Sequence, residues 1–438
     1  MIVVVVLAVL VVLAVFGLAH RYLWRRLVRD VSAPGGPWRR TGTVLAFVLP
    51  LLALGALVGG RALPLAAERW LAWPGYLWLA VLLYLLMALL VGEAIRPLLN
   101  RLPKRRPVPA APDGEARSAG GTTPDEVTQG EVTQGGTAPD GAVPAEGTER
   151  EGATGGSPAP GAPSPGRRLF VARAVAIGAA GAAVAVVGNG TYGVLRGPHL
   201  KQVTVPLAKL PARAHGYRIA VVSDIHLGPI LGRSHTQRIV DTINGAQPDL
   251  IAIVGDLVDG TVPELGSAAE PLARLRARDG AYFVTGNHEY FSGAAPWVEF
   301  VRSLGVHPLQ NARVELPGFD LAGVNDLAGT AEGDGPDFAR ALGDRDRSRA
   351  SVLLSHQPVT IHDAVRQGVD LQLSGHTHGG QLWPGNYLAE LANPTVAGLE
   401  RYGDTQLYVT RGAGAWGPPV RVGAPSDITI VTLASLRT

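Results

Sequence analysis

The sequence has 438 residues, and its 39 basic against 36 acidic side chains leave a formal net charge of +3. Because this basic excess is small, the chain does not have the composition of a protein that coats nucleic acid, and no nucleic-acid binding is expected. Charged residues make up 17% of the chain, below the ~25% usual in soluble domains, and this shortfall indicates membrane segments. The chain contains no cysteine, which excludes structural disulfides, a cysteine nucleophile and thiolate metal sites.

Four apolar runs in the first half of the chain are long enough to cross a membrane as helices. They cover residues 2–19, 44–60, 73–92 and 169–187. No basic segment precedes the first run, so we expect a spanning helix there rather than a cleaved signal. Arg167 and Arg168 stand directly before the fourth run, as in a twin-arginine export signal, so this run is interpreted as a fourth span or a signal-like anchor.

The charges between the runs predict an orientation. Basic residues gather before the second run, after the third and before the fourth, whereas only Arg61 and Arg69 separate the second run from the third. The positive-inside rule therefore predicts that the arginine-rich segments are cytoplasmic. The chain would then be a multi-pass protein of the cytoplasmic membrane, with its amino terminus and everything beyond residue 198 on the extracytoplasmic face.

Residues 103–166 hold 11 prolines and 13 glycines and contain no aromatic, leucine, isoleucine or methionine side chain. Such a segment buries too little apolar surface to offset the entropy of ordering it, so we expect a disordered linker. The expected organisation has four parts. These are a membrane domain with three helices over 1–102, the linker over 103–166, the fourth helix or anchor over 167–198, and a globular domain over 199–438.

Beyond residue 198, strand and helix patterns alternate along the chain. Short apolar runs predict strands over 217–223, 250–254, 281–285, 319–324, 351–355, 370–374, 406–410 and 427–433. Helical periodicity covers 236–243, 272–278 and 296–304. Strands interleaved with helices predict an α/β domain with buried sheets.

Five of these strands are followed directly by carboxylate, amide or imidazole side chains. The series reads Asp224-Ile-His226, Gly255-Asp256, Gly286-Asn287-His288-Glu289, His356 and Gly375-His376-Thr-His378-Gly-Gly. Open α/β sheets place their sites at the carboxyl ends of strands, and residues i and i+2 of an extended chain project to the same side. Oxygen and imidazole donors suit Mn, Fe or Zn. One ion would lower the pKa of a bound water, and two ions ~3.5–4 Å apart would hold both the attacking and the leaving oxygen of a phosphate, so we expect a metal centre at this edge.

The ordered series resembles the calcineurin-like metallophosphoesterase family, and the segments 379–381 and 407–414, with Pro418 and Arg421, are similar to its membrane-associated bacterial branch. The resemblance covers about residues 199–438. It implies a β-sandwich flanked by helices, preceded in this chain by about four transmembrane helices. It also implies two divalent metal ions, a nucleophilic hydroxide that bridges them, and a phosphate ester as the substrate.

The resemblance also assigns roles, motif by motif. The ligands of the first metal would be Asp224, His226 and His378. The ligands of the second would be Asn287, His356 and His376. Asp256 would bridge both ions, while His288 would not ligate but would donate a proton to the leaving oxygen or stabilise the phosphoryl group.

The substrate expected for a membrane-anchored enzyme is a phospholipid or a lipid-linked headgroup, so membrane lipids are the expected partners. One alternative is an extracytoplasmic phosphodiesterase that acts on soluble substrates. Another is a non-catalytic metal-binding sensor domain, against which the complete ligand set and His288 argue. A transporter is disfavoured because the apolar runs contain almost no charge. The sequence gives no indication of the oligomeric state.

Overall fold

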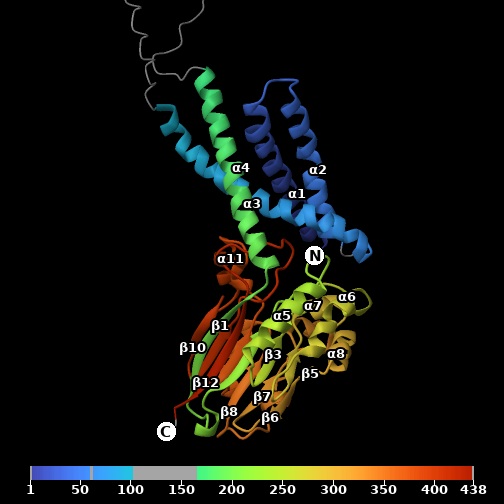
Figure 1. The fold of residues 1–438 in the computed structure, drawn as a ribbon, viewed down its shortest axis with the longest axis vertical. Helices are drawn as coiled ribbons and strands as arrows, with labels where there is room; N and C mark the ends of the chain where they lie inside the picture. Colours follow the sequence, from blue (N-terminus) through green and yellow to red (C-terminus); the bar gives the residue numbers. More distant parts are fainter. Residues whose placement is uncertain (1, 60–62, 102–164, 437–438) are drawn as a thin grey trace, which may run out of the picture.

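The computed structural model describes residues 2–59, 63–101 and 165–436, which form a helical bundle joined to an α/β domain (Figure 1). The expected linker lies outside the described residues, apart from its last two positions. Four helices have the length and hydropathy of membrane spans, as predicted. They are α1 (Ile2–Leu23), α2 (Pro37–Gly59), α3 (Leu65–Arg101) and α4 (Pro165–Leu195).

Helix α3 lies between α2 and α4 and packs closely against both. Small side chains make this possible, since Ala56 and Ala72 are fully buried in the bundle. A Cβ atom added at Gly75 would lie 2.4 Å from the carbonyl oxygen of Leu52, so only glycine allows α3 to approach α2 this closely. Close approach at small residues is the usual basis of helix association in membranes.

The bundle has two distinct ends (Figure 1). The amino terminus, the start of α3 and the end of α4 lie at the end that faces the α/β domain. The connection between α1 and α2, the end of α3 and the start of α4 lie at the far end. The chain therefore passes along the bundle four times, and its basic connections lie at the end remote from the α/β domain.

Helix α4 extends beyond the run expected at 169–187 and continues to Leu195. Its last turns contain polar residues, but they pack against the α/β domain. The carbonyl of Gly190 accepts a hydrogen bond from the backbone N–H of Arg421 at 3.3 Å. The strand that follows, β1 (His199–Leu207), begins only four residues after the helix ends, so the bundle and the domain are joined by a short connection.

Two six-stranded sheets form the centre of the α/β domain. The strand order of the first is β1, β12 (Asp427–Ser435), β2 (Tyr217–Val222), β3 (Leu250–Val254), β4 (Ala281–Val284) and β5 (His307–Pro308). The order of the second is β10 (Gly398–Tyr402), β11 (Thr405–Val409), β9 (Leu371–Ser374), β8 (Ala350–Leu354), β7 (Phe319–Gly323) and β6 (Ala312–Glu315). Strands β2 to β5 are parallel, and so are β7, β8, β9 and β11.

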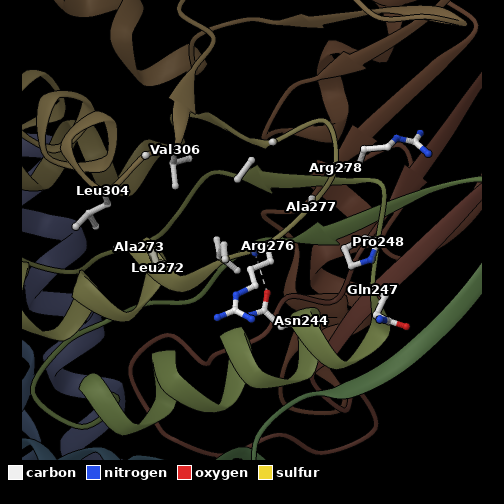
Figure 2. A pocket seen from close by; sticks show the side chains of 14 residues that line it. Asn244, Gln247, Pro248, Leu272, Ala273, Arg276, Ala277, Arg278, Leu304 and Val306 are labelled. Carbon is white, nitrogen blue, oxygen red and sulfur yellow. Dashed lines mark hydrogen bonds between the residues drawn. The ribbon is translucent and has the colours of Figure 1, made fainter.

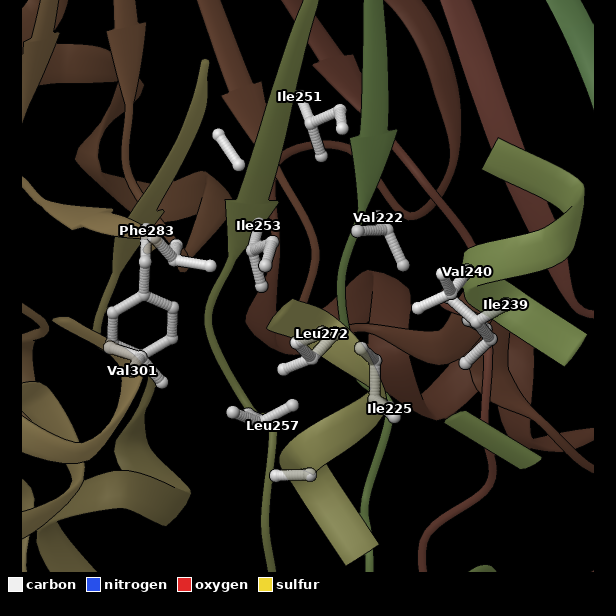
Figure 3. Packing of buried hydrophobic residues seen from close by; sticks show 14 of the residues in the cluster. Val222, Ile225, Ile239, Val240, Ile251, Ile253, Leu257, Leu272, Phe283 and Val301 are labelled. Atoms are coloured by element: carbon white, nitrogen blue, oxygen red, sulfur yellow. The ribbon is translucent and has the colours of Figure 1, made fainter. Parts of the chain in front are cut away.

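Side-chain alternation along the strands divides the core into layers. Ile219 and Val221 of β2 point into the space between the two sheets, where they pack with residues such as Phe319. Ala220 and Val222 point to the other side, where they pack against helices. Figure 3 shows this second cluster between the strands of the first sheet and the helices that pack against them. Those helices are α5 (Arg233–Ala246), α6 (Val262–Ala269) and α8 (Ala294–Ser303).

The outer face of the second sheet is covered by α9 (Phe338–Leu342) and α10 (Ile361–Gln367). Two further helices, α7 (Asn287–Ser292) and α11 (Gly385–Ala392), lie at the end of the domain that faces the bundle (Figure 1). The architecture is thus a β-sandwich flanked by helices and preceded by four apolar helices, as predicted.

All eight expected strands form, with ends shifted by at most two residues. The helix expected over 272–278 was wrong, because the chain there forms a 3-10 helix (Glu270–Arg274) and then becomes extended at Leu275. The backbone N–H of Arg276 donates instead to the side-chain oxygen of Asn244 at 2.9 Å. Strands β1, β5, β6 and β10 were not expected from the sequence.

Candidate metal centre

The eight predicted site residues all follow carboxyl ends of strands, as the sequence pattern indicated. Asp224 and His226 follow β2, and Asp256 follows β3. The other five come after the remaining strand ends, namely Asn287 and His288 after β4, His356 after β8, and His376 and His378 after β9. Because β2, β3 and β4 run parallel in one sheet, and β8 and β9 in the other, these ends meet at one edge of the sandwich.

One cluster contains Asp224, His226 and His378, all of them buried. The Nε2 atoms of the two imidazoles lie 3.0 Å apart, and Nε2 of His378 lies 3.3 Å from a carboxylate oxygen of Asp224. Three donor atoms of the types that transition metals prefer therefore converge on one point. This is the set that the resemblance assigned to the first metal.

A second cluster contains Asp256, His356 and His376. Nδ1 of His356 lies 2.8 Å from the carbonyl of Val254, so this nitrogen carries the proton and donates it. Nε2 of His356 lies 3.1 Å from a carboxylate oxygen of Asp256. Burial lowers the pKa of this imidazole, but the charge of Asp256 outweighs burial and raises it well above the ordinary value, so a metal ion would take the place of the Nε2 proton.

Asp256 lies between the two clusters. Its Oδ2 is 3.1 Å from Nε2 of His356 in one cluster and 3.8 Å from Nε2 of His226 in the other. Burial opposes ionisation of this carboxyl, but the neighbouring imidazoles, His356 foremost, outweigh burial and lower its pKa. The side chain is therefore a carboxylate placed to serve both clusters.

The amide oxygen of Asn287 is buried and has no hydrogen-bond partner among the described residues. The residues on either side of Asn287 both approach Asp256. A Cβ atom at Gly286 would lie 2.2 Å from a carboxylate oxygen of Asp256, and the backbone N–H of His288 donates to the same oxygen at 2.9 Å. An orphaned oxygen in this position fits the ligand role expected of Asn287.

His288 lies beside the first cluster, with its ring centroid 4.6 Å from that of His226. Its side chain retains 14% exposure, whereas the side chain of His226 is fully buried. Nδ1 of His288 lies 2.7 Å from a carboxylate oxygen of Asp259. His288 lies outside the two predicted ligand sets, although with His226 and Asp259 it forms a further group of possible ligands, and it keeps part of its ring exposed.

Asp259 is a site residue that the sequence reasoning missed. The same carboxylate oxygen that meets His288 lies 2.9 Å from Nδ1 of His226. Asp259 thus fixes which nitrogen of His226 carries the proton and leaves Nε2 free to ligate, as outer carboxylates do in metal sites. Burial opposes its ionisation, but His226 outweighs burial and lowers the pKa of Asp259 to about 2. The available signal was its spacing, three residues after Asp256.

Glu289 holds the backbone of two site loops together, a role that the sequence did not suggest. Its fully buried carboxyl group accepts hydrogen bonds from the backbone N–H groups of Asp256 at 3.0 Å, Leu257 at 2.7 Å and Gly286 at 2.6 Å. Burial, together with the charge of Asp256, raises the pKa of Glu289 to about 7. The loop after β3 is therefore tied to the start of α7.

Arg421 supports His378 from the other side and is 6% exposed. Its guanidinium donates to the carbonyls of Gly414 at 2.7 Å, His378 at 3.0 Å and Ala424 at 3.0 Å. It also lies 3.2 Å from Nδ1 of His378. This single side chain connects the loop that carries His378 to the segment that contacts α4.

Five of the predicted ligands have a left-handed backbone, which is uncommon for residues other than glycine. Their φ angles lie between 48° and 72°, and they are Asp224, His226, Asp256, His376 and His378. Each such conformation costs on the order of 1–3 kcal/mol and persists only where the surrounding structure enforces it. The concentration of these residues at one edge of the sandwich marks this edge as a functional site.

A separate hollow of about 640 Å³ lies away from this edge (Figure 2). It is lined by residues between Asn244 and Pro248, between Leu272 and Ala281, and between Leu304 and Val306. Its lining contains arginines but no histidine or carboxylate, so it lacks the donors that gather at the strand ends.

Comparison with known proteins supports the interpretation of this edge. A family model described as calcineurin-like phosphoesterase matches residues 217–380. A metallophosphoesterase of Aquifex aeolicus is 34% identical over 239 residues, which cover 53% of this chain and 91% of that protein. The chain belongs to the calcineurin-like metallophosphoesterase family.

Two other relatives of the family extend the comparison. A Danio rerio protein described as a transmembrane protein with metallophosphoesterase domain is 41% identical over 250 residues, which cover 54% of this chain and 57% of the relative. A metallophosphoesterase of Helicobacter pylori is 38% identical over 248 residues, covering 56% of this chain and 66% of the relative. The match thus spans little more than half the length of the Danio rerio relative. Together with the four apolar helices, the description of that relative supports membrane association for this metallophosphoesterase.

Proposed function

We propose that this protein is a membrane-anchored dimetal phosphoesterase that hydrolyses a phosphate ester. The observation that carries the proposal is the convergence of two donor clusters on either side of the carboxylate of Asp256. Asp224, His226 and His378 would hold one divalent ion. Asn287, His356 and His376 would hold the other, and Asp256 would contact both. Ions at these positions would neutralise phosphate charge and activate water.

The residues around the clusters would perform the remaining chemistry. His288 would donate a proton to the leaving oxygen, because its ring is the one beside the clusters that keeps an exposed edge. Asp259 would orient that ring, since it accepts from Nδ1 and leaves Nε2 to face the substrate. Glu289 and Arg421 would hold the ligand-bearing loops in their strained conformations. All of these contributions belong to positioning, proton transfer and electrostatic stabilisation.

Metal content tests this proposal most directly. The purified full-length protein, loaded with Mn, Fe or Zn, should bind two divalent ions and hydrolyse a chromogenic phosphodiester only when they are present. Asp256→Asn should weaken the binding of both ions, because one carboxylate serves both clusters. Loss of one ion alone would refute the bridging role. Absence of bound metal together with absence of hydrolysis would refute the phosphoesterase assignment, and metal binding without hydrolysis would favour a sensor.

We also propose an arrangement in the cytoplasmic membrane that places the α/β domain on the extracytoplasmic face. The support is that the basic connections lie at the end of the bundle remote from this domain. Residues 1–102 and 167–198 would form the membrane part, 103–166 a linker and 199–438 the catalytic domain. A carboxy-terminal tag should then be digested by protease added to intact spheroplasts. A tag that stays protected would refute this orientation.

The substrate that we propose is a phospholipid or a lipid-linked headgroup. Helix α4 ends at Leu195 and the catalytic domain begins at His199, so the site is held close to the bilayer. Lipid-linked phosphates are concentrated there, whereas soluble esters are dilute. A screen of headgroups in vesicles against soluble diesters tests this proposal. Much faster hydrolysis of the soluble diesters would refute it.

A further inference from the structure

Helix α11 carries an apolar face that is largely exposed in the described structure. Tyr387 is 59% exposed, Leu388 71% and Leu391 84%. At about 100° per residue, these three side chains fall within an arc of roughly 100° on one side of the helix. None of the residues of α11 is buried. Single exposed apolar residues are ordinary, but three large ones on one helical face indicate that something covers them.

The position of α11 identifies what covers it. The helix lies at the end of the catalytic domain that faces the bundle (Figure 1). Just before it, the carbonyl of Trp383 accepts a hydrogen bond from the hydroxyl of Tyr84 in α3 at 2.9 Å. Leu382 packs with the bundle residues of α3 and α4. The segment that carries α11 is therefore attached to two helices that qualify as membrane spans.

The exposed aromatic side chains of the catalytic domain occur at the same end. They are Phe291, Trp383, Tyr387 and Trp416. The rings of Phe291 and Trp416 lie 5.5 Å and 5.8 Å from that of His288, so this apolar rim reaches the candidate active site. Aromatic side chains collect at the level of lipid headgroups, and an amphipathic helix lies flat at that level.

We infer that α11 is embedded in the headgroup region of the bilayer and that the active site opens onto the membrane surface beside it. The lipid bilayer itself covers the apolar face, because the residues just before α11 contact the helices that are proposed to cross the bilayer. This inference rests on the membrane anchoring proposed above but not on the proposed hydrolysis. It narrows the substrate class to phosphate esters whose apolar part stays in the membrane while the phosphate reaches the two clusters.

The absence of cysteine from the chain permits a direct test. Leu388→Cys and Leu391→Cys variants of the full-length protein would be labelled with an environment-sensitive fluorophore and placed in vesicles of phosphatidylcholine and phosphatidylglycerol. Val12→Cys in α1, exposed on the bundle, provides the lipid reference, and Asp404→Cys in the turn between β10 and β11 provides the water reference. Quenching would then be compared between vesicles whose lipids carry a spin label near the headgroup and vesicles whose lipids carry it deep in the acyl chain.

We expect the headgroup spin label to quench positions 388 and 391 more strongly than position 404, and the acyl-chain spin label to quench position 12. Labels at 388 and 391 that behave like the label at 404 would overturn the inference. Labels with shifted emission but no quenching would indicate a protein partner and would also overturn it. An unquenched label at position 12 would refute the anchoring and the inference with it. None of these outcomes depends on hydrolysis, so failure of this inference can be distinguished from failure of the phosphoesterase proposal.

A second variant links this surface to turnover. Leu388→Asp combined with Leu391→Asp should reduce hydrolysis of a headgroup ester in vesicles while leaving the rate with a soluble aryl diester unchanged. Neither leucine lies in the candidate metal centre. A lower rate on vesicles with an unchanged rate on the soluble diester therefore reports on access of the substrate from the membrane. Equal rates on vesicles for this variant and the wild type would overturn the inference.

Discussion

Asp259 offers the sharpest test of the reasoning about the site, because one of its oxygens meets two histidines that have different proposed roles. It lies 2.9 Å from Nδ1 of His226, a proposed ligand, and 2.7 Å from Nδ1 of His288, the proposed acid. The substitution Asp259→Asn keeps the shape and an accepting oxygen but removes the negative charge. A structural role alone would therefore tolerate it.

The expected magnitude follows from the two hydrogen bonds. Each changes from a bond with a charged group, worth about 1.5–3 kcal/mol, to a neutral one worth about 0.5–1.5 kcal/mol. The total loss is then about 2 kcal/mol, or roughly 30-fold at ~1.36 kcal/mol per factor of ten. Removal of outer partners of metal ligands usually costs about 10–100-fold, which is the same range.

The measurement needs two readouts. Titration of the full-length protein with Mn²⁺ against a competing chelator would report metal affinity, and hydrolysis of a chromogenic diester at saturating metal would report the contribution of His288. Both should fall in Asp259→Asn. The matched control is Asp404→Asn, in which a fully exposed carboxylate is changed in the same way. If metal affinity and saturated turnover both match the wild type, Asp259 does not support either histidine.

Three further substitutions test separate parts of the structure. His288→Ala should retain both ions yet lose about 10²–10⁴-fold in turnover, with a smaller loss for an activated aryl leaving group that needs little protonation; loss of an ion would identify His288 as a ligand. Gly375→Ala should abolish metal binding at the first cluster, since its Cβ would lie 2.4 Å from a carboxylate oxygen of Asp224. Gly245→Ala, where a Cβ meets nothing within 4 Å, should bind metal normally, and equal metal content in the two variants would contradict the argument. Burial lowers the pKa of His235 to about 3, so the folded protein keeps this ring neutral while the unfolded chain protonates it below its ordinary pKa. As the pH falls from 7 to 5, protonation of His235 in the unfolded chain should lower the free energy of unfolding by about 2 kcal/mol. Urea titrations of His235→Leu should lack this part of the pH dependence. An identical pH dependence in the variant and the wild type would refute the role of His235.

The strands and the positions of the predicted ligands could be anticipated from the sequence because both have local signals. A buried parallel strand is a short apolar run, and the glycines and polar residues that follow it mark the point where the chain leaves the sheet. Taken singly, the histidines after β8 and β9 and the carboxylates after β2 and β3 are weak signals, but their ordered series after five predicted strands is a strong one. The structure brings these residues together because the strand ends of two sheets meet at one edge.

The supporting residues were harder to anticipate because their roles depend on contacts between distant segments. Asp259 looked like an ordinary loop carboxylate, and only the structure brings it against His288, which follows a different strand. Arg421 reaches His378 across 43 positions of the chain. Strand β1 was missed because it pairs with β12 and has a Pro near its end, and α11 because it is too short for its apolar face to form a clear period.

The place of β12 in the first sheet has a consequence for the biosynthesis of the protein. This strand lies between β1 and β2, with Val431 opposite Val203 on one side and Ile219 on the other. Strand β1 follows directly after α4, yet it pairs only with β12, which the ribosome delivers more than two hundred residues later. The sheet therefore cannot close while the chain is still being made. Until residue 435 has been synthesised, the newly made segment beside the membrane exposes an open sheet edge, so this stage is when aggregation or capture by a chaperone is expected.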